Sequence, residues 1–321
     1  MTITQLQYVL AVAEYQNFTL AAEKSFVTQP TLSMQIQKLE DELDILIFDR
    51  SKKPIQLTEV GKKIVEQARN IVNESSRIKD IVDQQKGFIG GEFKLGIIPT
   101  IMPTLLPMFL KNFINKYPKI NLKIEEQNTE TLIKKLQEGH IDAAIAATPL
   151  EIENIKEKPL YYEPFVAYVP ENHRLFSKQK ISIDDLDVDD ILLLEDGHCF
   201  REGVINLCKA NKNSKDDNFQ LASGSFETMI KLSNEGLGMT LLPYLHTLDL
   251  PESEKKHLRF FEEPNPAREV SLIFHKSELK LQIVEALRDV ISGVIRGAIA
   301  FQNVKIISPI GNKKNTKIPT V

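Results

Sequence analysis

The chain holds only two cysteines among its 321 residues, Cys199 and Cys208, and they stand nine positions apart in the stretch GHCFREGVINLC. A cysteine thiolate attacks peroxides, and the sulfenic acid that results condenses readily with a second thiol. In a reducing compartment, however, two cysteines are usually buried side chains without a chemical role. The pair therefore predicts either a redox couple or two inert thiols, and its surroundings must decide.

Cys199 comes shortly after the apolar stretch 190–194 and opens a helical pattern that runs to Cys208. The first turn of a helix carries unpaired N–H groups and the positive end of the helix dipole, and both favour the thiolate form of a cysteine placed there. Cys208 falls on the apolar face of the same pattern with Val204 and Leu207, so a buried free thiol is its expected state in the reduced protein.

No metal or cofactor is expected. The cysteines lack the C-x-x-C spacing of zinc sites, and the histidines at positions 140, 173, 246, 257 and 275 form no close pair. The chain also has no glycine loop of the Walker type and no G-x-S-x-G sequence, so nucleotide hydrolysis and hydrolysis by a serine nucleophile have no support.

The composition is that of an ordinary globular protein, with 42% hydrophobic and 26% charged residues. No apolar run reaches the roughly 18 residues of a membrane helix, and the N-terminal segment lacks the features of a signal peptide, so a cytoplasmic protein is expected. The net charge is −4, and residues 1–90 carry eleven basic against twelve acidic side chains. Bulk charge gives no support to nucleic-acid binding, which must rest on local placement.

The first sixty residues predict a winged helix-turn-helix domain, 1–60. Apolar residues recur at helical spacing over 3–13, two alanines mark a short second helix, and a third helix begins after Thr28 with Pro30 in its first turn. Two short extended pieces then flank a basic tip at 50–54, which suits a β-hairpin wing.

Polar side chains opposite the apolar stripe of the third helix, together with the wing, are candidates for DNA contact. Glutamine pairs with adenine through two hydrogen bonds, serine and threonine serve several base edges, and lysine and arginine hold phosphates. The same residues would also suit an ordinary solvated helix face. The predicted DNA-binding residues are Gln29, Pro30, Thr31, Ser33, Gln35, Lys38, Arg50, Lys52 and Lys53.

Residues 58–87 predict one long linker helix that forms a dimer. Positions 64, 68, 71, 75, 78 and 82 are apolar or small and step alternately by four and three, which is the period of a coiled-coil seam. Glycines at 87, 90 and 91 predict a hinge after it.

Residues 88–301 alternate predicted strands with helices, which favours an α/β domain of two lobes with parallel sheets and a cleft between them. Strands are expected at 190–196 and 219–223, on either side of the cysteine segment. The tail, 302–321, has four lysines and no acidic residue, and we expect it to be disordered.

The order of these parts resembles the LysR-type transcriptional regulators, which join a winged helix-turn-helix, a linker helix and a two-lobed effector domain like that of periplasmic binding proteins. The stretches that carry the resemblance are FTLAAEKSFVTQPTLSMQIQKLEDELDILIFDR and FETMIKLSNEGLGMTLLP, and it extends over residues 1–300. The resemblance implies promoter DNA and RNA polymerase as partners and a homotetramer, whereas the seam alone supports a dimer. Met34 stands where the nearest members often carry a smaller residue.

Within that family, LLLEDGHCFREGVINLC is similar to the redox segment of the members that sense hydrogen peroxide. His198 and Cys199 match the reactive pair, and Cys208 matches the resolving cysteine, which implies a reversible disulfide between Cys199 and Cys208. The residues that match the peroxide pocket are Thr100, Thr129, His198 and Arg268.

Hydrogen-bond donors beside Cys199 would stabilise the hydroxide that leaves the peroxide. Thr100 and Thr129 each follow a predicted strand, at the sheet edge where α/β domains bind ligands, although each would equally serve as a helix N-cap. Arg268 would alternatively form a surface ion pair with Glu263 or Glu269. A lone histidine such as His198 is more often structural.

A helix over 199–208 would hold the two cysteines about 13 Å apart along its axis and on opposite sides of it. A disulfide requires Cα atoms roughly 4.4–6.8 Å apart, so the segment must unwind before the bond forms. Gly203 lowers the resistance to unwinding by about 1 kcal/mol relative to alanine. Oxidation is therefore expected to refold residues 197–220 and to change contacts between subunits.

We predict a transcription regulator, not an enzyme, that binds DNA and responds to hydrogen peroxide through Cys199. The alternative is a regulator of the same family that binds a small organic metabolite in the cleft, with Cys199 incidental. A thiol peroxidase is a third reading, and the helix-turn-helix argues against it. No membrane partner is expected.

Overall fold

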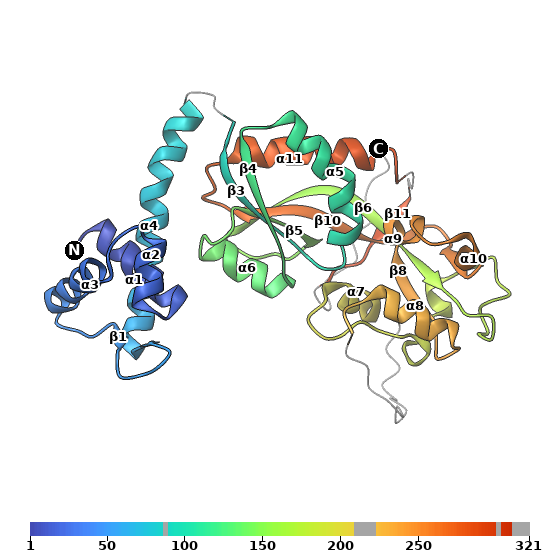
Figure 1. Ribbon diagram of the computed structural model, residues 1–321. Coiled ribbons are helices and arrows are strands. Elements are labelled where there is room, and N and C mark those ends of the chain that lie inside the picture. The colour runs from blue at the N-terminus through green and yellow to red at the C-terminus, as the bar shows by residue number, and fades with distance from the viewer. Residues whose placement is uncertain (86–88, 209–222, 300–302, 310–321) are drawn as a thin grey trace. The chain divides into compact units, whose positions relative to one another are not determined.

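The chain folds as two units, Met1–Phe88 and Ile89–Val321, each described by itself (Figure 1). The computed structural model describes residues 1–85, 89–208, 223–299 and 303–309. Within those ranges, no helix is long and apolar enough to cross a membrane.

Three helices form the body of the N-terminal unit: α1 (Ile3–Tyr15), α2 (Phe18–Lys24) and α3 (Gln29–Leu43). Side chains of Thr2, Asn17 and Thr28 accept hydrogen bonds from the first backbone N–H groups of α1, α2 and α3 respectively, which fixes where each helix begins. Apolar residues at helical spacing bury one face of each helix in a common core that includes Leu6, Val9, Ala21, Leu32 and Ile36.

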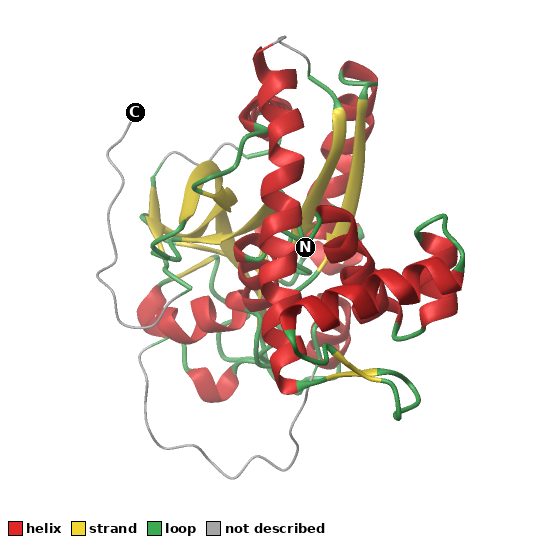
Figure 2. Cartoon of the chain, turned by 90° about the vertical axis from the view of Figure 1, so that its left-hand side faces the viewer, coloured by secondary structure: helices red, strands yellow, loops and turns green. Residues whose placement is uncertain are grey.

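A two-stranded hairpin, β1 (Phe48–Asp49) and β2 (Gln56–Leu57), follows α3 and is antiparallel. Figure 2 shows the two short strands and the loop that joins them at the edge of the N-terminal helices. This hairpin and its basic loop lie where the sequence predicts a wing.

The long helix α4 (Glu59–Gln85) begins after Thr58, whose hydroxyl accepts a hydrogen bond from the N–H of Gly61 at 2.8 Å. Its first half packs against its own unit, since Val65 and Ala68 are buried in the N-terminal core. The predicted seam is therefore wrong at Ala68, which has an intramolecular partner. Ile71, Ile78 and Val82 are exposed and continue the apolar row along the second half of α4.

The first lobe of the second unit is built on three parallel strands, with β3 between β4 and β5. The strands are β3 (Gly91–Ile97), β4 (Ile120–Glu126) and β5 (Ala143–Thr148), and the helices packed on them are α5 (Met102–Lys116), α6 (Thr129–Gln137) and α11 (Leu281–Ile295). α5 and α11 lie side by side (Figure 1). We call the buried side chains of this lobe the first core; they include Leu95, Phe109, Ile145 and Leu287.

Two long antiparallel strands, β6 (Ile155–Tyr168) and β10 (Asn265–His275), join the lobes. Along β6, Tyr161 belongs to the first core, whereas Phe165 and Tyr168 belong to the second core, which is the buried cluster of the second lobe. That lobe contains β7 (Lys180–Ile181), α7 (Cys199–Leu207), α8 (Phe226–Asn234), β8 (Thr240–Pro243), α10 (Glu252–Lys255) and β9 (Leu258–Phe261). The short helix α9 (Tyr244–Leu248) follows β8, and its Leu245 belongs to the first core.

The expectation of parallel sheets is confirmed for β3, β4 and β5 and is wrong for the rest of the second unit's main strands. β10 is antiparallel to both β5 and β6, and β6 is antiparallel to β8 and β9, because β6 and β10 are crossing strands that serve both lobes. The predicted strand at 190–196 is also wrong, since only Ile191 makes a bridge, to Met239. The strand predicted at 219–223 falls almost entirely outside the described residues.

The tail departs from the predicted disorder over its first part. Val304–Ile306 form β11, which pairs in parallel with the start of β10, and Ile307 is buried. A strand of three residues leaves little trace in the sequence, because a neighbouring strand supplies its hydrogen bonds. Residues 310–321 lie outside the described ranges.

Candidate functional site

Cys199 is the first residue of α7, and Cys208 directly follows the last one. Cys199 is half-buried and packs against the first core, whereas Cys208 is 7% exposed and belongs to the second core, with Val204 and Leu207. The nine residue steps from Cys199 to Cys208 correspond to a rise of about 13 Å along the helix axis. The reduced protein therefore holds its two thiols in different environments, too far apart for a bond.

The thiol of Cys208 is kept protonated by its surroundings. Burial in the second core raises the pKa of Cys208 to about 12, and the negative charge of Asp187 adds to this effect. A thiolate is the reactive form of cysteine. Cys208 is thus unreactive while it stays in that core.

Arg268 lies at the start of β10, buried to 3% exposure, between the carboxylate of Glu163 and Thr100. Its Nη2 and Nε donate to Glu163 Oε2 at 2.7 and 3.0 Å. Its Nη1 donates to the hydroxyl of Thr100 at 2.9 Å, and Nη2 also donates to the carbonyl of Thr100 at 3.0 Å. The predicted peroxide-pocket residues Thr100 and Arg268 therefore do meet.

The ion pair of Arg268 is not the one considered from the sequence. Glu163 is its direct cross-strand neighbour on β6, and the alternatives Glu263 and Glu269 bond elsewhere, to Asn303 and Thr148. Glu163 was missed because its position beside Arg268 depends on strands about a hundred residues apart. Its signal in the sequence is a single acid in the apolar stretch YYEPFVAYVP.

Phe200 connects Arg268 with the reactive end of α7. The guanidinium carbon of Arg268 lies 5.1 Å from the centre of the Phe200 ring, within the range of a cation–π contact. Phe200 is the residue after Cys199, so Arg268 and Thr100 lie close to the first turn of α7. The aromatic ring between them also packs on Phe165 and Phe226.

Thr129 opens α6 but does not cap it. The cap is Asn128, whose side-chain oxygen accepts a hydrogen bond from the N–H of Thr131 at 2.9 Å. The hydroxyl of Thr129 is buried and has no hydrogen-bond partner among the described residues. A Cβ added at Gly197, which has a φ of +90°, would lie 4.0 Å from Asn128 Nδ2, so the loop before Cys199 approaches this turn.

His198 precedes Cys199, and its side chain lies beside Glu195 and Gly224. Its Nε2 lies 3.5 Å from Glu195 Oε1, and a Cβ added at Gly224 would meet the same nitrogen at 2.8 Å. Its side chain does not cap α7. Thr100 and Arg268 are therefore hydrogen-bonded to each other. Thr129 is near Cys199 because the loop at Gly197 approaches the start of α6. His198 is near Cys199 because the two residues are adjacent in the chain.

Not all of the α3 side chains that were expected to face DNA are exposed. Gln29, Pro30, Thr31 and Lys38 are exposed, whereas Ser33 and Gln35 are half-buried at the flanks of the helix. Gln5 Nε2 lies 3.4 Å from the side-chain oxygen of Gln35. Met34, which the sequence marks only as unusual, is 61% exposed. Lys52 and Lys53 are exposed in the loop of the hairpin.

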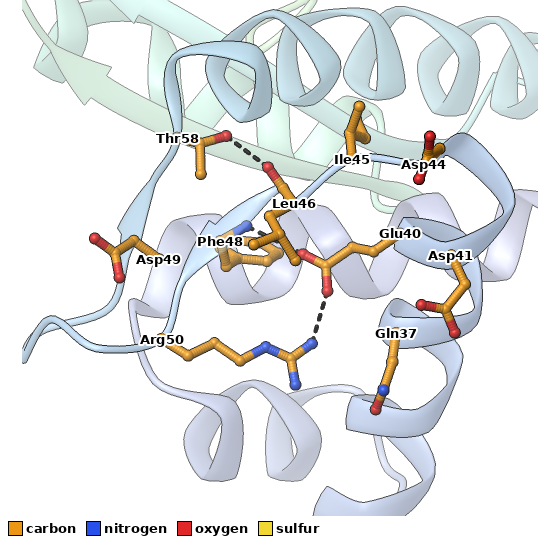
Figure 3. Close-up of a pocket in the computed structure, with 10 residues that line it drawn as sticks. All are labelled: Gln37, Glu40, Asp41, Asp44, Ile45, Leu46, Phe48, Asp49, Arg50 and Thr58. Atoms are coloured by element: carbon orange, nitrogen blue, oxygen red, sulfur yellow. Dashed lines mark hydrogen bonds and ion pairs between the residues drawn. The ribbon is translucent and has the colours of Figure 1, made fainter.

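Arg50 holds the hairpin on α3 (Figure 3). Its Nη2 donates to Glu40 Oε2 at 2.8 Å, and the other oxygen of Glu40 accepts from the N–H groups of Ile47 and Phe48 at 2.8 and 3.2 Å. Glu40 is buried, and the Arg50 guanidinium also lies over the Phe18 ring at 5.1 Å. Arg50 therefore has a structural role, besides any contact with DNA.

Comparison with known proteins matches both units to one family. Residues 3–62 match the bacterial regulatory helix-turn-helix proteins of the lysR family, and residues 86–295 match the LysR substrate binding domain. The hydrogen peroxide-inducible genes activator of Pectobacterium carotovorum subsp. carotovorum is 33% identical over 92% of this chain and 98% of its own length. The DNA-binding transcriptional dual regulator OxyR of Escherichia coli K12 is 33% identical over 90% and 95%.

A full-length OxyR from Pseudomonas aeruginosa has a similar structure, with a TM-score of 0.74 and 35% identity over 91% of this chain and 98% of that one. These similarities extend from the helix-turn-helix through both lobes. The protein accordingly belongs to the LysR family of transcription regulators, and within that family it is similar to OxyR.

Proposed function

We propose that this regulator senses hydrogen peroxide, with Cys199 as the nucleophile and Cys208 as the resolving thiol. The observation that carries the proposal is the placement of the chain's two thiols at the two ends of α7, one half-exposed at the first helical residue and one buried after the last. The similarity to peroxide-inducible activators supports it. A metabolite sensor of the same family would need neither thiol in these positions.

The chemistry takes two steps. The thiolate of Cys199 attacks one oxygen of hydrogen peroxide, the O–O bond breaks, and hydroxide leaves and takes up a proton to become water. The sulfenic acid of Cys199 then condenses with the thiol of Cys208, which forms the S–S bond and releases a second water. One peroxide is thereby reduced by two electrons, which the two thiols supply.

Three groups are suited to stabilise the departing hydroxide. The Thr100 oxygen accepts a hydrogen bond from Arg268, so its own O–H is free to donate. The Thr129 hydroxyl is buried without a partner among the described residues. Arg268 supplies a positive charge near the first turn of α7, partly balanced by Glu163. Donors fixed in advance act most strongly where charge develops, and we include His198 as a further donor.

The second step requires α7 to unwind, because a helix keeps the two Cα atoms about 13 Å apart. The refolded segment would then change the contacts between subunits and so the spacing of the DNA-binding units. We propose that the exposed second half of α4, with Ile71, Ile78 and Val82, pairs with a second copy to form the dimer, and that two dimers form a tetramer.

LysR regulators bind DNA through the helix-turn-helix, and we propose which residues do so here. Base edges would be contacted from α3 and phosphates from the hairpin loop and the helix flank, at promoters where RNA polymerase is recruited in the cytoplasm. The proposed residues remain Gln29, Pro30, Thr31, Ser33, Gln35, Lys38, Arg50, Lys52 and Lys53.

The test is a titration of the reduced protein with hydrogen peroxide, followed by counting of free thiols. We expect both thiols to disappear at micromolar peroxide, with one peroxide consumed per chain, and to return on reduction. Two thiols that persist at micromolar peroxide would contradict peroxide sensing and would favour the metabolite sensor.

A further inference from the structure

A short segment near the end of the chain connects β10 with the helix that carries the cysteines. Residues 303–309, which we call the C-terminal strap, include β11, and β11 pairs in parallel with residues 265–267 at the start of β10. The N–H of Asn265 donates to the carbonyl of Asn303 at 3.0 Å, and the N–H of Ile307 donates to the carbonyl of Ala267 at 2.8 Å. The strap is thus fixed at both ends of β11.

Beyond β11 the strap enters the core that holds Cys208. Ile307 is 1% exposed and belongs to the second core, as do Leu207 and Cys208, and Pro309 is buried as well. Asn206, two residues before Cys208, donates from Nδ2 to the carbonyl of Ser308 at 3.0 Å. The strap therefore touches the last turn of α7 by a hydrogen bond and shares its apolar core.

We propose that the C-terminal strap holds the end of α7 in place and thereby sets how readily Cys208 leaves its core to meet Cys199. The proposal rests on the proposed function, since it concerns the second step of the peroxide response. In that step the Cys199 sulfenic acid and the Cys208 thiol form the S–S bond and release water. The strap acts through Ile307, which packs in the second core, and through the carbonyl of Ser308, which accepts from Asn206. Asn206 and Ile307 are thus positioning residues, and the first step, at Cys199, is left unchanged.

Three observations make the strap a restraint on Cys208 rather than a passive end of the chain. Cys208 stays protonated while buried, so it must leave the core to react. Cys208 lies at the end of α7 that the strap contacts, so these contacts oppose its movement out of the core. The strap also lies on Ala267, the residue before Arg268, so it connects the end of α7 with the strand that carries the pocket arginine.

The experiment measures the alkylation of Cys208 in a Cys199→Ser protein, in which Cys208 is the only thiol, without peroxide. We expect Asn206→Ala, which removes an exposed side chain and one hydrogen bond, to raise the alkylation rate about five-fold. Ile307→Ala should raise it by more than about ten-fold. Ile306→Ala is the matched control, because Ile306 is half-buried outside the second core and should change the rate little.

The same variants in the protein with both cysteines complete the test. With peroxide, trapping of the Cys199 sulfenic acid should proceed at the wild-type rate, and disulfide formation should accelerate in step with the alkylation of Cys208. Unchanged alkylation in Asn206→Ala and Ile307→Ala, with both proteins folded, would overturn the proposal. So would faster alkylation without faster disulfide formation. If Cys199 does not react with peroxide at all, the proposed function fails, but the alkylation result still decides whether the strap restrains Cys208.

Discussion

Cys199 and Cys208 lie at opposite ends of the same nine-residue helix, and each packs into a different core of the two-lobed domain. The two ends of α7 therefore contact different cores, the first core at Cys199 and the second core at Cys208. A disulfide between them would require one thiol to leave its core. The position of α7 thus makes the proposed disulfide dependent on a structural change.

The two cysteines should fail in different ways when each is replaced. Cys199→Ser should abolish peroxide consumption, because the buried and protonated Cys208 cannot act as the nucleophile. Cys208→Ser should react with peroxide at the wild-type rate and stop at a sulfenic acid. A dimedone-type reagent followed by mass measurement detects that acid. If Cys208→Ser reacts far more slowly than the wild type, the assigned roles are reversed.

The burial of Cys208 predicts a specific dependence of stability on pH. Its pKa is about 12 in the folded protein against the ordinary value of 9.0, so above pH 9 the unfolded chain releases a proton that the folded chain keeps. The free energy of unfolding of the reduced protein should therefore fall as the pH rises from 9 towards 12. Cys208→Ala should lack this component, whereas Cys199→Ala should keep it. Denaturant unfolding below and above pH 9 measures this component. If the free energy of unfolding depends on pH in the same way in the wild type and in Cys208→Ala, the prediction is wrong.

Replacement of Thr100 should slow the reaction of Cys199 with peroxide more than it lowers the stability of the fold. Thr100→Val removes the hydroxyl that accepts from Arg268 and is free to donate to the departing hydroxide, and we expect about 10²-fold slower sulfenic acid formation. Thr104→Val is the control, since the Thr104 hydroxyl donates to the carbonyl of Ile101 within its own helix turn. Stopped-flow measurement of peroxide reduction compares the reaction rates of Thr100→Val and Thr104→Val. Equal rates in both variants would remove Thr100 from the pocket.

The folding of the N-terminal unit and of α7 follows from local sequence, and these parts could be predicted well. Thr28, Pro30 and the apolar stripe of α3 specify a helix through neighbours only a few residues away. Likewise, the period of 199–208 suffices to bury Cys208 and to place Cys199 at a helix start.

The features that could not be predicted from the sequence depend on contacts between residues far apart along the chain. The pairing of Arg268 with Glu163 arises from the register of β6 against β10, and β11 exists because β10 offers a free edge. The apolar stretch 190–196 has the composition of a strand but finds one bridge partner, Met239, so it packs as an extended loop. Ala68 fits a coiled-coil seam by period, yet it is buried in the core of its own unit, on a helix that packs against α1.

Substitutions in the hairpin loop and in α3 should affect DNA binding differently, since the first remove phosphate contacts and the second remove base contacts. Lys52→Ala should weaken binding to all duplexes alike and reduce the salt dependence by about one unit of slope, because Lys52 is exposed in the hairpin loop and would contact phosphate. Gln35→Ala should instead reduce the preference for selected over random duplexes. Fluorescence anisotropy at several salt concentrations distinguishes the two effects. Unchanged discrimination in Gln35→Ala would exclude this half-buried residue from base contact.

The most direct test of the switch is hydrogen exchange of the backbone amides of α7 in the reduced and the peroxide-treated protein. We expect the amides between Cys199 and Cys208 to be protected in the reduced state, to lose protection when the disulfide forms, and to regain it on reduction, because the bond cannot close across an intact helix. The amides of α11, in the first core, should exchange alike in both states. Equal protection of α7 before and after oxidation would contradict the switch, even if the disulfide is present.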